Sequence, residues 1–241
     1  MGLSVNTKLQ ANYENYYDGE SEWRRRGAID KVANIVRLCR PFAHEQILEI
    51  GSGEGAMLAR MSELGFGSSL YGLEVSRSAV DATQKRQIPR LVECRVFEGY
   101  SIPYADGRFD VAILSHVVEH LEHPRQLLYE AARVAKLVFV EVPLEDTLRL
   151  PRDYVFDPVG HINFYSPKTI RRLIQTCELE VISQQITNSS RLVYQYRLGS
   201  VRGAATYFLK ESLLRISEAL ATRLLTYNCS LLCAKSRPQT L

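Results

Sequence analysis

The chain has 241 residues, of which 46% are hydrophobic and 24% are charged, with a formal net charge of +3. A chain of this length and composition buries a core without disulfides or a metal, so we expect one globular domain with an added segment. A net charge this small does not by itself predict a nucleic-acid partner. The N-terminus has no apolar signal core and no apolar stretch is long enough for a membrane helix, which predicts a cytoplasmic protein without a membrane span.

The first part of the chain predicts one helix and then a regular alternation of strands and helices. The helix, Glu22–Cys39, has apolar residues on one face and is ended by Pro41. The strands that follow are Gln46–Ile50, Ser69–Val75, Arg90–Phe97, Asp110–Leu114 and Leu137–Val142, and the helices between them are Ala56–Leu64, Ser78–Arg86 and Pro124–Ala135. This alternation is typical of a parallel sheet covered by helices on both faces.

The last third of the chain predicts two closing strands around a helical insertion. Ser166 is a predicted N-cap, with Pro167 opening a helix that runs to about Cys177. The closing strands are Glu180–Thr187 and Tyr227–Ala234, and the insertion between them is Ser189–Leu225. Its apolar stripe is expected to pack on the domain, with a dimer contact or a lipid-facing surface as the alternative. The stripe consists of Leu209, Leu213, Ile216, Leu220 and Leu224.

Charge and cysteine placement add two weaker expectations. From Leu150 to the end, twelve Lys or Arg residues stand against six Asp or Glu. This excess indicates either a solvated surface or a basic lip for an anionic substrate. The five cysteines have no zinc-type spacing, and Cys229 and Cys233 would share one buried face of a strand. We therefore expect reduced core cysteines in a reducing compartment.

A glycine run between the first strand and its helix is the clearest candidate for a binding site. Gly51, Gly53 and Gly55 allow a ligand to approach the backbone closely, at the N-terminus of the helix. Gly51-x-Gly53-x-x-Ala56 also fits the dinucleotide fingerprint. Glu74 ends the second strand, where a carboxylate can accept hydrogen bonds from both hydroxyls of a ribose. The pattern predicts a ligand with a nucleoside, and an NAD(P)-dependent oxidoreductase remains an alternative.

Glu49 distinguishes between the two ligands, because an anion immediately before the glycine run suits an ammonium group better than a pyrophosphate. The ordered segments LEIGSGEG, GLEVS, IPYADGRFD, SHVVEHLEHP and GHINFYSP are decisive. Together they resemble class I S-adenosylmethionine-dependent methyltransferases, particularly the group that acts largely on small molecules. The resemblance spans about Gln46–Cys177.

The resemblance implies an α/β fold of the Rossmann-like class I methyltransferase type. Its sheet would be mostly parallel and seven-stranded, with helices on both faces, an N-terminal helical lid and a helical insertion near the C-terminus. The implied division is a cap at 1–45, the methyltransferase core at 46–188, the insertion at 189–226, and the last strand with the tail at 227–241.

The resemblance also implies S-adenosylmethionine as the cofactor and assigns residues to its parts. Glu49 would position the amino group, and Gly51, Ser52, Gly53 and Gly55 would line the methionine part. Glu74 and Val75 would meet the ribose, Glu98 and Gly99 would face adenine, and Ser115 with His116 would border the methyl donor. Similar enzymes often close an N-terminal helix over the cofactor. The aromatic candidates for this lid are Tyr13, Tyr16, Tyr17 and Trp23, which could instead anchor the N-terminal segment.

Histidines are the candidate catalytic residues, because a hydroxyl acceptor would need a general base. His161 ranks first, since its loop should reach the acceptor, and His116 ranks second. His120 and Asn163 are candidates for the substrate side. Each could equally be a hydrogen-bonded residue that holds a loop. His116, His120 and His123 lack an accompanying carboxylate or cysteine pattern, so no metal site is predicted.

These observations predict a methyltransferase that transfers a methyl group to an oxygen or nitrogen nucleophile of a small-molecule acceptor and leaves S-adenosylhomocysteine. A catalytically silent S-adenosylmethionine-binding protein is the remaining alternative beside the oxidoreductase. No RNA-binding module is recognisable in the sequence, and the apolar stripe of the insertion makes a homodimer possible.

Overall fold

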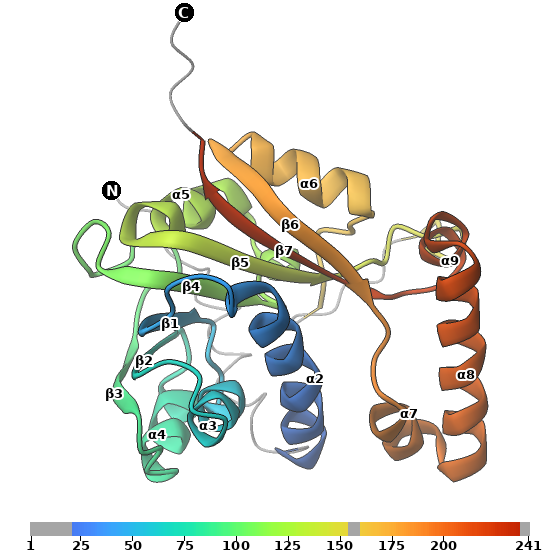
Figure 1. Cartoon of the computed structure of the whole chain (residues 1–241), viewed down its shortest axis with the longest axis horizontal. Helices are drawn as coiled ribbons and strands as arrows, with labels where there is room; N and C mark the ends of the chain where they lie inside the picture. The colour runs from blue at the N-terminus through green and yellow to red at the C-terminus, as the bar shows by residue number, and fades with distance from the viewer. Residues whose placement is uncertain (1–20, 154–159, 237–241) are drawn as a thin grey trace, which may run out of the picture.

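The computed structural model describes residues 21–153 and 160–236, so Tyr13, Tyr16 and Tyr17 lie outside the described residues. Its centre is a seven-stranded sheet in the order β3-β2-β1-β4-β5-β7-β6 (Figure 1). The strands are β1 Gln46–Ile50, β2 Ser69–Glu74, β3 Leu91–Val96, β4 Phe109–Ser115, β5 Ala135–Pro143, β6 Leu179–Thr187 and β7 Asn228–Lys235. The helices are α2 Ser21–Cys39, α3 Ala56–Glu63, α4 Arg77–Lys85, the 3-10 turn η1 Val118–His120, α5 Pro124–Val134, α6 Pro167–Gln175, α7 Arg191–Leu198, α8 Ser200–Ile216 and α9 Glu218–Leu224.

The sheet is parallel except for β7, which pairs antiparallel with both β5 and β6. Successive strands move outward from β1 in one direction to β2 and β3, and then return to β4 on its other side. In open α/β sheets such a reversal leaves a crevice at the carboxyl ends of the strands. The predicted mostly parallel, seven-stranded sheet is confirmed, and β1 and β4 mark where its ligand site should lie.

Two apolar cores cover the two faces of the sheet, because successive strand residues point to opposite sides. One core joins α2 and α3 to Ile47, Val111 and Ile113. The other joins α5 and α6 to Leu48 and Leu114. Every residue of β4 is buried, as the continuous apolar run in the sequence predicted for a strand covered on both sides.

Local signals place most element ends within two residues of the prediction. Ser166 caps α6 by accepting a hydrogen bond from the Thr169 amide at 3.4 Å, and Thr169 completes a reciprocal capping box. Cys229 and Cys233 are fully buried in β7, as predicted. In the described ranges, no helix has the length and apolar character that a membrane crossing requires.

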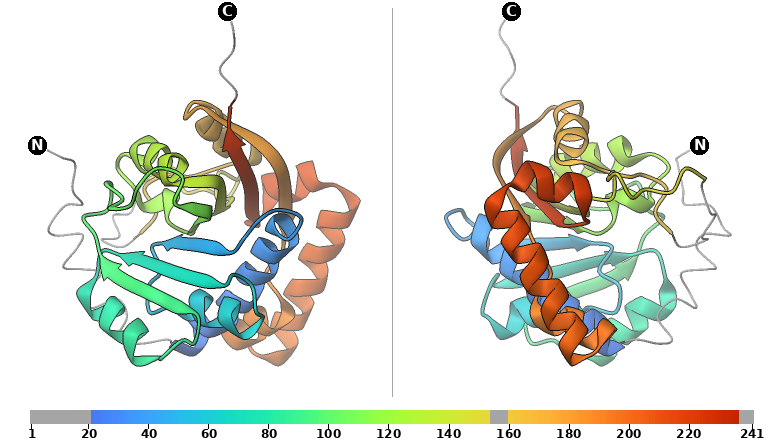
Figure 2. Two further views of the ribbon diagram at one scale, coloured as in Figure 1. Left: turned by 60° about the vertical axis from the view of Figure 1, so that its left-hand side comes forward. Right: turned by 90° about the vertical axis from the view of Figure 1, so that its right-hand side faces the viewer.

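The helical insertion corrects one prediction. Helices α7, α8 and α9 form a column at the end of the molecule farthest from β3 (Figures 1 and 2). Of the predicted stripe, Leu213 packs against the core, whereas Leu209 is 66% exposed and Ile216 is 79% exposed. The stripe is not one face, because Ser217 ends α8 and caps the separate helix α9.

A buried hydrogen-bond network ties α2 to the middle of the sheet. Glu141 of β5 is fully buried and accepts hydrogen bonds from Asn34 Nδ2 at 2.8 Å, Ser230 Oγ at 2.7 Å and Ser115 Oγ at 3.2 Å. Asn34 comes from α2, while Ser230 and Ser115 come from the strands beside β5. The network fixes the helix over the crevice, because each donor that leaves a buried carboxyl group destabilises the folded protein.

We predict that Asn34→Ala lowers the free energy of unfolding by about 1–3 kcal/mol, because it removes a buried donor from Glu141. Arg37→Ala, on the solvent-exposed side of the same helix, is the matched control and should change stability by less than about 0.5 kcal/mol. Urea denaturation of both variants measures the difference. Equal effects would show that Asn34 does not anchor α2.

Candidate active site

A cavity of about 720 Å³ lies at the carboxyl ends of β1, β2 and β4, with α2 over it. Its volume suits a nucleoside-sized ligand together with a small second molecule. Most of the predicted site residues line it: Trp23, Glu49, Gly51, Ser52, Gly53, Glu74, Val75, Gly99, Ser115, His116, His120 and His161. The other predicted residues within the described ranges, Gly55, Glu98 and Asn163, are not in the lining.

The glycine turn follows β1 and forms the floor of the cavity. The amides of Gly51 and Ser52 both donate to the Leu73 carbonyl, at 2.8 and 3.0 Å, which draws the turn toward β2. Gly51 has a φ of +76°, and a Cβ there would lie 2.6 Å from Val117 Cγ2. Both the backbone conformation and the close approach therefore require glycine at this position.

Gly55 lies behind the turn rather than in the cavity wall. It precedes α3 with a φ of +76°, and a Cβ there would meet Thr83 Cγ2 of α4 at 2.7 Å. Thr83 Oγ1 also donates to the Gly53 carbonyl at 3.0 Å. The geometry therefore gives Gly55 a packing role against α4, whereas the sequence predicted a cofactor contact.

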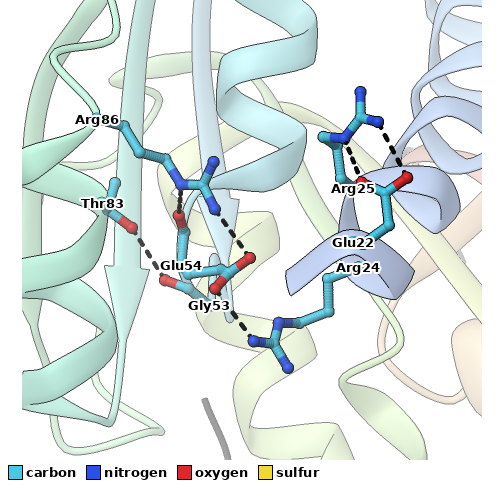
Figure 3. A network of polar contacts seen from close by, with 7 residues as sticks. All are labelled: Glu22, Arg24, Arg25, Gly53, Glu54, Thr83 and Arg86. Atoms are coloured by element: carbon cyan, nitrogen blue, oxygen red, sulfur yellow. Dashed lines mark hydrogen bonds and ion pairs between the residues drawn. The ribbon is translucent and has the colours of Figure 1, made fainter. Parts of the chain in front are cut away.

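Glu54 clamps the turn between two helices, a role that the sequence did not indicate (Figure 3). Its carboxylate pairs with Arg24 of α2 at 3.1 Å and with Arg86, next to α4, at 2.8 Å. Arg86 Nε also donates to the Glu54 carbonyl at 2.5 Å. Because the Glu54 carboxylate is buried, these charge-assisted bonds are stronger than ion pairs at the surface. The clamp holds the glycine turn in place from both sides.

Glu74 stands at the end of β2 in a fixed orientation. The amide of Gly53 donates to its Oε2 at 2.8 Å, and the amides of Val75 and Ser76 donate to its Oε1 at 2.8 and 3.1 Å. Three backbone donors hold the carboxyl group in one orientation. A buried carboxyl group is thus fixed in the cavity wall where the sequence predicted the ribose contact.

Glu49, which lies near the end of β1 beside the glycine turn, is only partly compensated by its neighbours. Its side chain is 4% exposed, and its Oε2 has no hydrogen-bond partner among the described residues. Burial raises the pKa of Glu49 to about 8, while Lys31 of α2 opposes this rise and Glu74 adds to it. An unpaired buried carboxylate is costly. The residues present therefore fit a ligand that brings a cationic, hydrogen-bonding group to this point.

Lys31 and Phe97 are cavity residues that the sequence analysis missed. Burial lowers the pKa of Lys31, although Glu141, Glu119 and Glu49 oppose this effect. Phe97 follows β3 and is buried beside Gly99, where it offers an apolar surface to a planar ring. Glu98, predicted to contact adenine, is exposed and does not line the cavity.

Three histidines form the opposite wall. His116 follows β4 with a φ of +57°, and its Nδ1 lies 3.3 Å from Glu119 Oε1. The rings of His120 and His161 meet edge to face, with centroids 4.7 Å apart. His120 and His161 come from η1 and from the loop after residue 159, so the fold brings together residues separated by 41 positions.

Backbone hydrogen bonds hold that loop against η1. The Glu119 carbonyl accepts from the amides of Ile162 and Asn163 at 2.9 and 3.0 Å. Asn163 Nδ2 donates to the Leu121 carbonyl at 2.7 Å. Asn163 therefore fixes the position of His161 from outside the cavity, which differs from the substrate contact that the sequence suggested.

Glu119 is the second missed residue of this wall. It is fully buried beneath the histidines. Burial acts to raise the pKa of Glu119, but the contact with His116 and the charges of His116 and His120 outweigh burial and keep it below its ordinary value. The wall thus contains an anion beside three imidazoles. The segment SHVVEHLEHP carried a signal for it, since the acid stands directly before His120.

The methyltransferase domain family matches residues 21–184, which is most of the chain. The chain belongs to this family. The match confirms the resemblance to class I S-adenosylmethionine-dependent methyltransferases and, with it, S-adenosylmethionine as the expected cofactor, in preference to a dinucleotide.

Individual relatives are more distant. An uncharacterized methyltransferase of Mycobacterium leprae is 30% identical over 138 residues, covering 55% of this chain and 50% of that protein. A mitochondrial ubiquinone biosynthesis O-methyltransferase of Candida albicans is 27% identical over 130 residues, covering 52% of this chain and 36% of that protein. The chain therefore spans half or less of the length of these two relatives.

Solved structures agree with the fold. The geranyl diphosphate C-methyltransferase of Streptomyces coelicolor A3(2), solved with Mg²⁺, geranyl diphosphate and S-adenosyl-L-homocysteine, superposes with a TM-score of 0.64 at 14% identity. The superposition covers 97% of this chain and 100% of that one. At this identity the likeness establishes the shared architecture.

We predict that Gly51→Ala weakens S-adenosylhomocysteine binding at least about tenfold, because Val117 must move into the cavity in addition to the cost of a positive φ. Gly107→Ala is the matched control, since Gly107 has a φ of +63° but nothing within 4 Å of its added Cβ. Isothermal calorimetry should find cofactor affinity unchanged in this control. A similar loss in both variants would attribute the effect to backbone strain alone.

Proposed function

We propose that the protein transfers the methyl group of S-adenosylmethionine to an oxygen or nitrogen nucleophile of a small-molecule acceptor and releases S-adenosylhomocysteine. The observation that carries this proposal is the Glu49 side chain, which is buried beside the glycine turn and has one carboxyl oxygen without a hydrogen-bond partner among the described residues. A ligand with a cationic, hydrogen-bonding group would satisfy this oxygen, and S-adenosylmethionine has such a group on its methionine end.

The remaining cofactor contacts follow from that anchor. Gly51, Ser52 and Gly53 would meet the methionine part, and Glu74 would accept from the ribose hydroxyls. The apolar surface of Phe97, beside Gly99, would take adenine. This order runs from β1 through β2 to β3 along the lining of the cavity. With the cofactor bound in this order, its sulfonium methyl would lie near Ser115 and His116, beside the other two histidines.

The protein must mainly align the reacting atoms, because the thioether formed from a sulfonium is a good leaving group. Holding the nucleophile, the methyl carbon and the sulfur in line can supply up to about 7–11 kcal/mol of the barrier. We assign contact with the acceptor to His161, with His116 next to the methyl group. Trp23 and Lys31 of α2 line the same cavity, which supports an acceptor small enough to be enclosed. The ubiquinone O-methyltransferase relative supports an oxygen nucleophile.

We predict that cofactor affinity rises with pH between about 6 and 7.5, below the pKa of an α-amino group near 8. In the free protein burial raises the pKa of Glu49 to about 8, with Lys31 opposing this rise and Glu74 adding to it. Glu49 is therefore protonated below that pH, and binding of an ammonium group must release its proton. Glu49→Gln should lower the affinity and abolish its pH dependence. Calorimetry in buffers of different ionisation enthalpy measures the released proton, and a slope that survives in Glu49→Gln would contradict this role.

We predict that His161→Ala lowers turnover by about 10²-fold or more while S-adenosylhomocysteine affinity changes less than about twofold, because His161 lies on the acceptor wall. His44→Ala, which removes a histidine stacked on Phe66 outside the cavity lining, should change neither quantity. Equal losses of turnover and cofactor affinity in His161→Ala would place the residue on the cofactor side.

The acceptor is identified by a screen of phenols, hydroxy acids and amines with S-adenosylmethionine, with S-adenosylhomocysteine release as the readout. Release that depends on one of these compounds supports the proposal. Tight S-adenosylhomocysteine binding without release from any class would favour the catalytically silent alternative.

A further inference from the structure

Glu119, His120 and His161 form a group with the composition of a metal site. One potential ligand atom from each residue lies within 4.8 Å of the other two. Ligands about 2.1 Å from one ion stand roughly 3–3.5 Å apart in octahedral or tetrahedral coordination. A bound ion would therefore need to draw these atoms together by at most about 1.3–1.8 Å, a movement that side-chain rotation can supply.

The buried carboxylate is the observation that points to a ligand. Glu119 is fully buried, and within the described part of the chain neither of its carboxylate oxygens has a hydrogen-bond partner. The nearest imidazole nitrogen, His116 Nδ1, lies 3.3 Å away without the alignment of a hydrogen bond. Buried charges are normally paired by hydrogen bonds or coordinated to metals. The Glu119 carboxylate is therefore able to coordinate a cation without giving up a hydrogen bond.

The two histidines are oriented as metal ligands usually are. His161 Nδ1 contacts Glu145 Oε2 at 2.5 Å, and His120 Nδ1 contacts the Gly160 carbonyl at 3.2 Å. An oxygen acceptor on Nδ1 fixes the tautomer and makes Nε2 the basic nitrogen, which is the arrangement found behind most metal-bound imidazoles. Both histidines line the cavity, so an ion between them would face its contents.

We propose that Glu119, His120 and His161 bind one divalent transition-metal ion, such as Zn²⁺, at the acceptor wall of the cavity. Two imidazoles and one carboxylate suit Zn²⁺ and neighbouring first-row metals, and three protein ligands leave coordination positions open. The open side faces the space that the proposed function assigns to the acceptor. The segment SHVVEHLEHP supplies two of the ligands, and the loop after residue 159 supplies the third.

The ion would also define the acceptor, a step that rests on the proposed function. A divalent cation in this position would supply Lewis acidity, which lowers the pKa of a hydroxyl that it contacts. The acceptor hydroxyl then loses its proton to solvent, and its oxygen forms a bond to the methyl carbon. The carbon–sulfur bond breaks with its electron pair left on sulfur, giving a methyl ether, a neutral thioether and one proton. The favoured acceptor class is a hydroxyl compound that can ligate a metal.

The test is a metal titration of the full chain after dialysis against a chelator. Co²⁺, read by its visible absorption, and Zn²⁺, read by calorimetry, should each bind in a single saturable equivalent. Glu119→Gln and His161→Asn should each weaken binding at least about a hundredfold. Glu145→Ala should weaken binding by about 10–100-fold, because it removes only the acceptor that orients His161. Zn²⁺ should raise the melting temperature of the wild type more than that of these variants.

The control removes the same residue types from the same segment. Glu122→Gln with His123→Asn changes two exposed residues adjacent to the site and should leave Co²⁺ binding unchanged. An absence of saturable binding would overturn the proposal, and so would Co²⁺ binding that persists in Glu119→Gln and in His161→Asn. Since the His161 side chain is partly exposed, His161→Asn remains informative if Glu119→Gln does not fold.

Cofactor binding separates this inference from the proposed function. S-adenosylhomocysteine affinity should be the same within about threefold in the wild type and in His161→Asn, because the metal ligands lie on the opposite wall. Metal binding without S-adenosylhomocysteine binding would support the metal site and refute the proposed function. The reverse result would refute the metal site alone.

Discussion

The burial of four carboxyl groups at the carboxyl edge of the sheet is the constraint on which the site depends. Glu49, Glu74, Glu119 and Glu141 are all buried near the ends of the four central strands. Buried carboxyl groups need hydrogen-bond donors or cations beside them. Backbone amides satisfy Glu74, and polar side chains satisfy Glu141. Glu49 and Glu119 keep oxygens without a hydrogen-bond partner among the described residues. Glu74 and Glu141 therefore hold parts of the fold together, whereas Glu49 and Glu119 can still accept a ligand.

Helix α2 provides several of the partners that this constraint demands. Asn34 reaches Glu141, Arg24 reaches Glu54, and Lys31 lies close enough to Glu49 to influence its ionisation. A helix that precedes the first strand thereby lines the cavity. Its apolar residues pack on the sheet as those of an ordinary amphipathic helix do, while three of its polar residues lie beside carboxyl groups of the site.

The sequence predicted the sheet well because its strands and helices alternate with clear periodicity and glycine or proline boundaries. Glu49, Glu74 and part of the glycine run, which the sequence suggested for the cofactor, line one cavity. The sequence could not separate Gly51 from Gly55, because only the tertiary neighbours, Val117 and Thr83, decide which glycine faces the cavity. The insertion stripe failed for a related reason, since periodicity does not reveal a break in the helix. His161 reaches Glu119 and His120 from a distant loop, which no local pattern in the sequence reveals.

The clamp around Glu54 has a consequence for how firmly the glycine turn is held. Its two arginines come from different parts of the fold: Arg24 from α2 and Arg86 from the end of α4. A displacement of α2 away from the sheet would separate Arg24 from Glu54. Arg86 would keep its bonds to the side chain and the backbone carbonyl of Glu54, because it does not belong to α2. The contacts of Arg86 would therefore keep the glycine turn in place against α4 even if α2 moved away from Glu54.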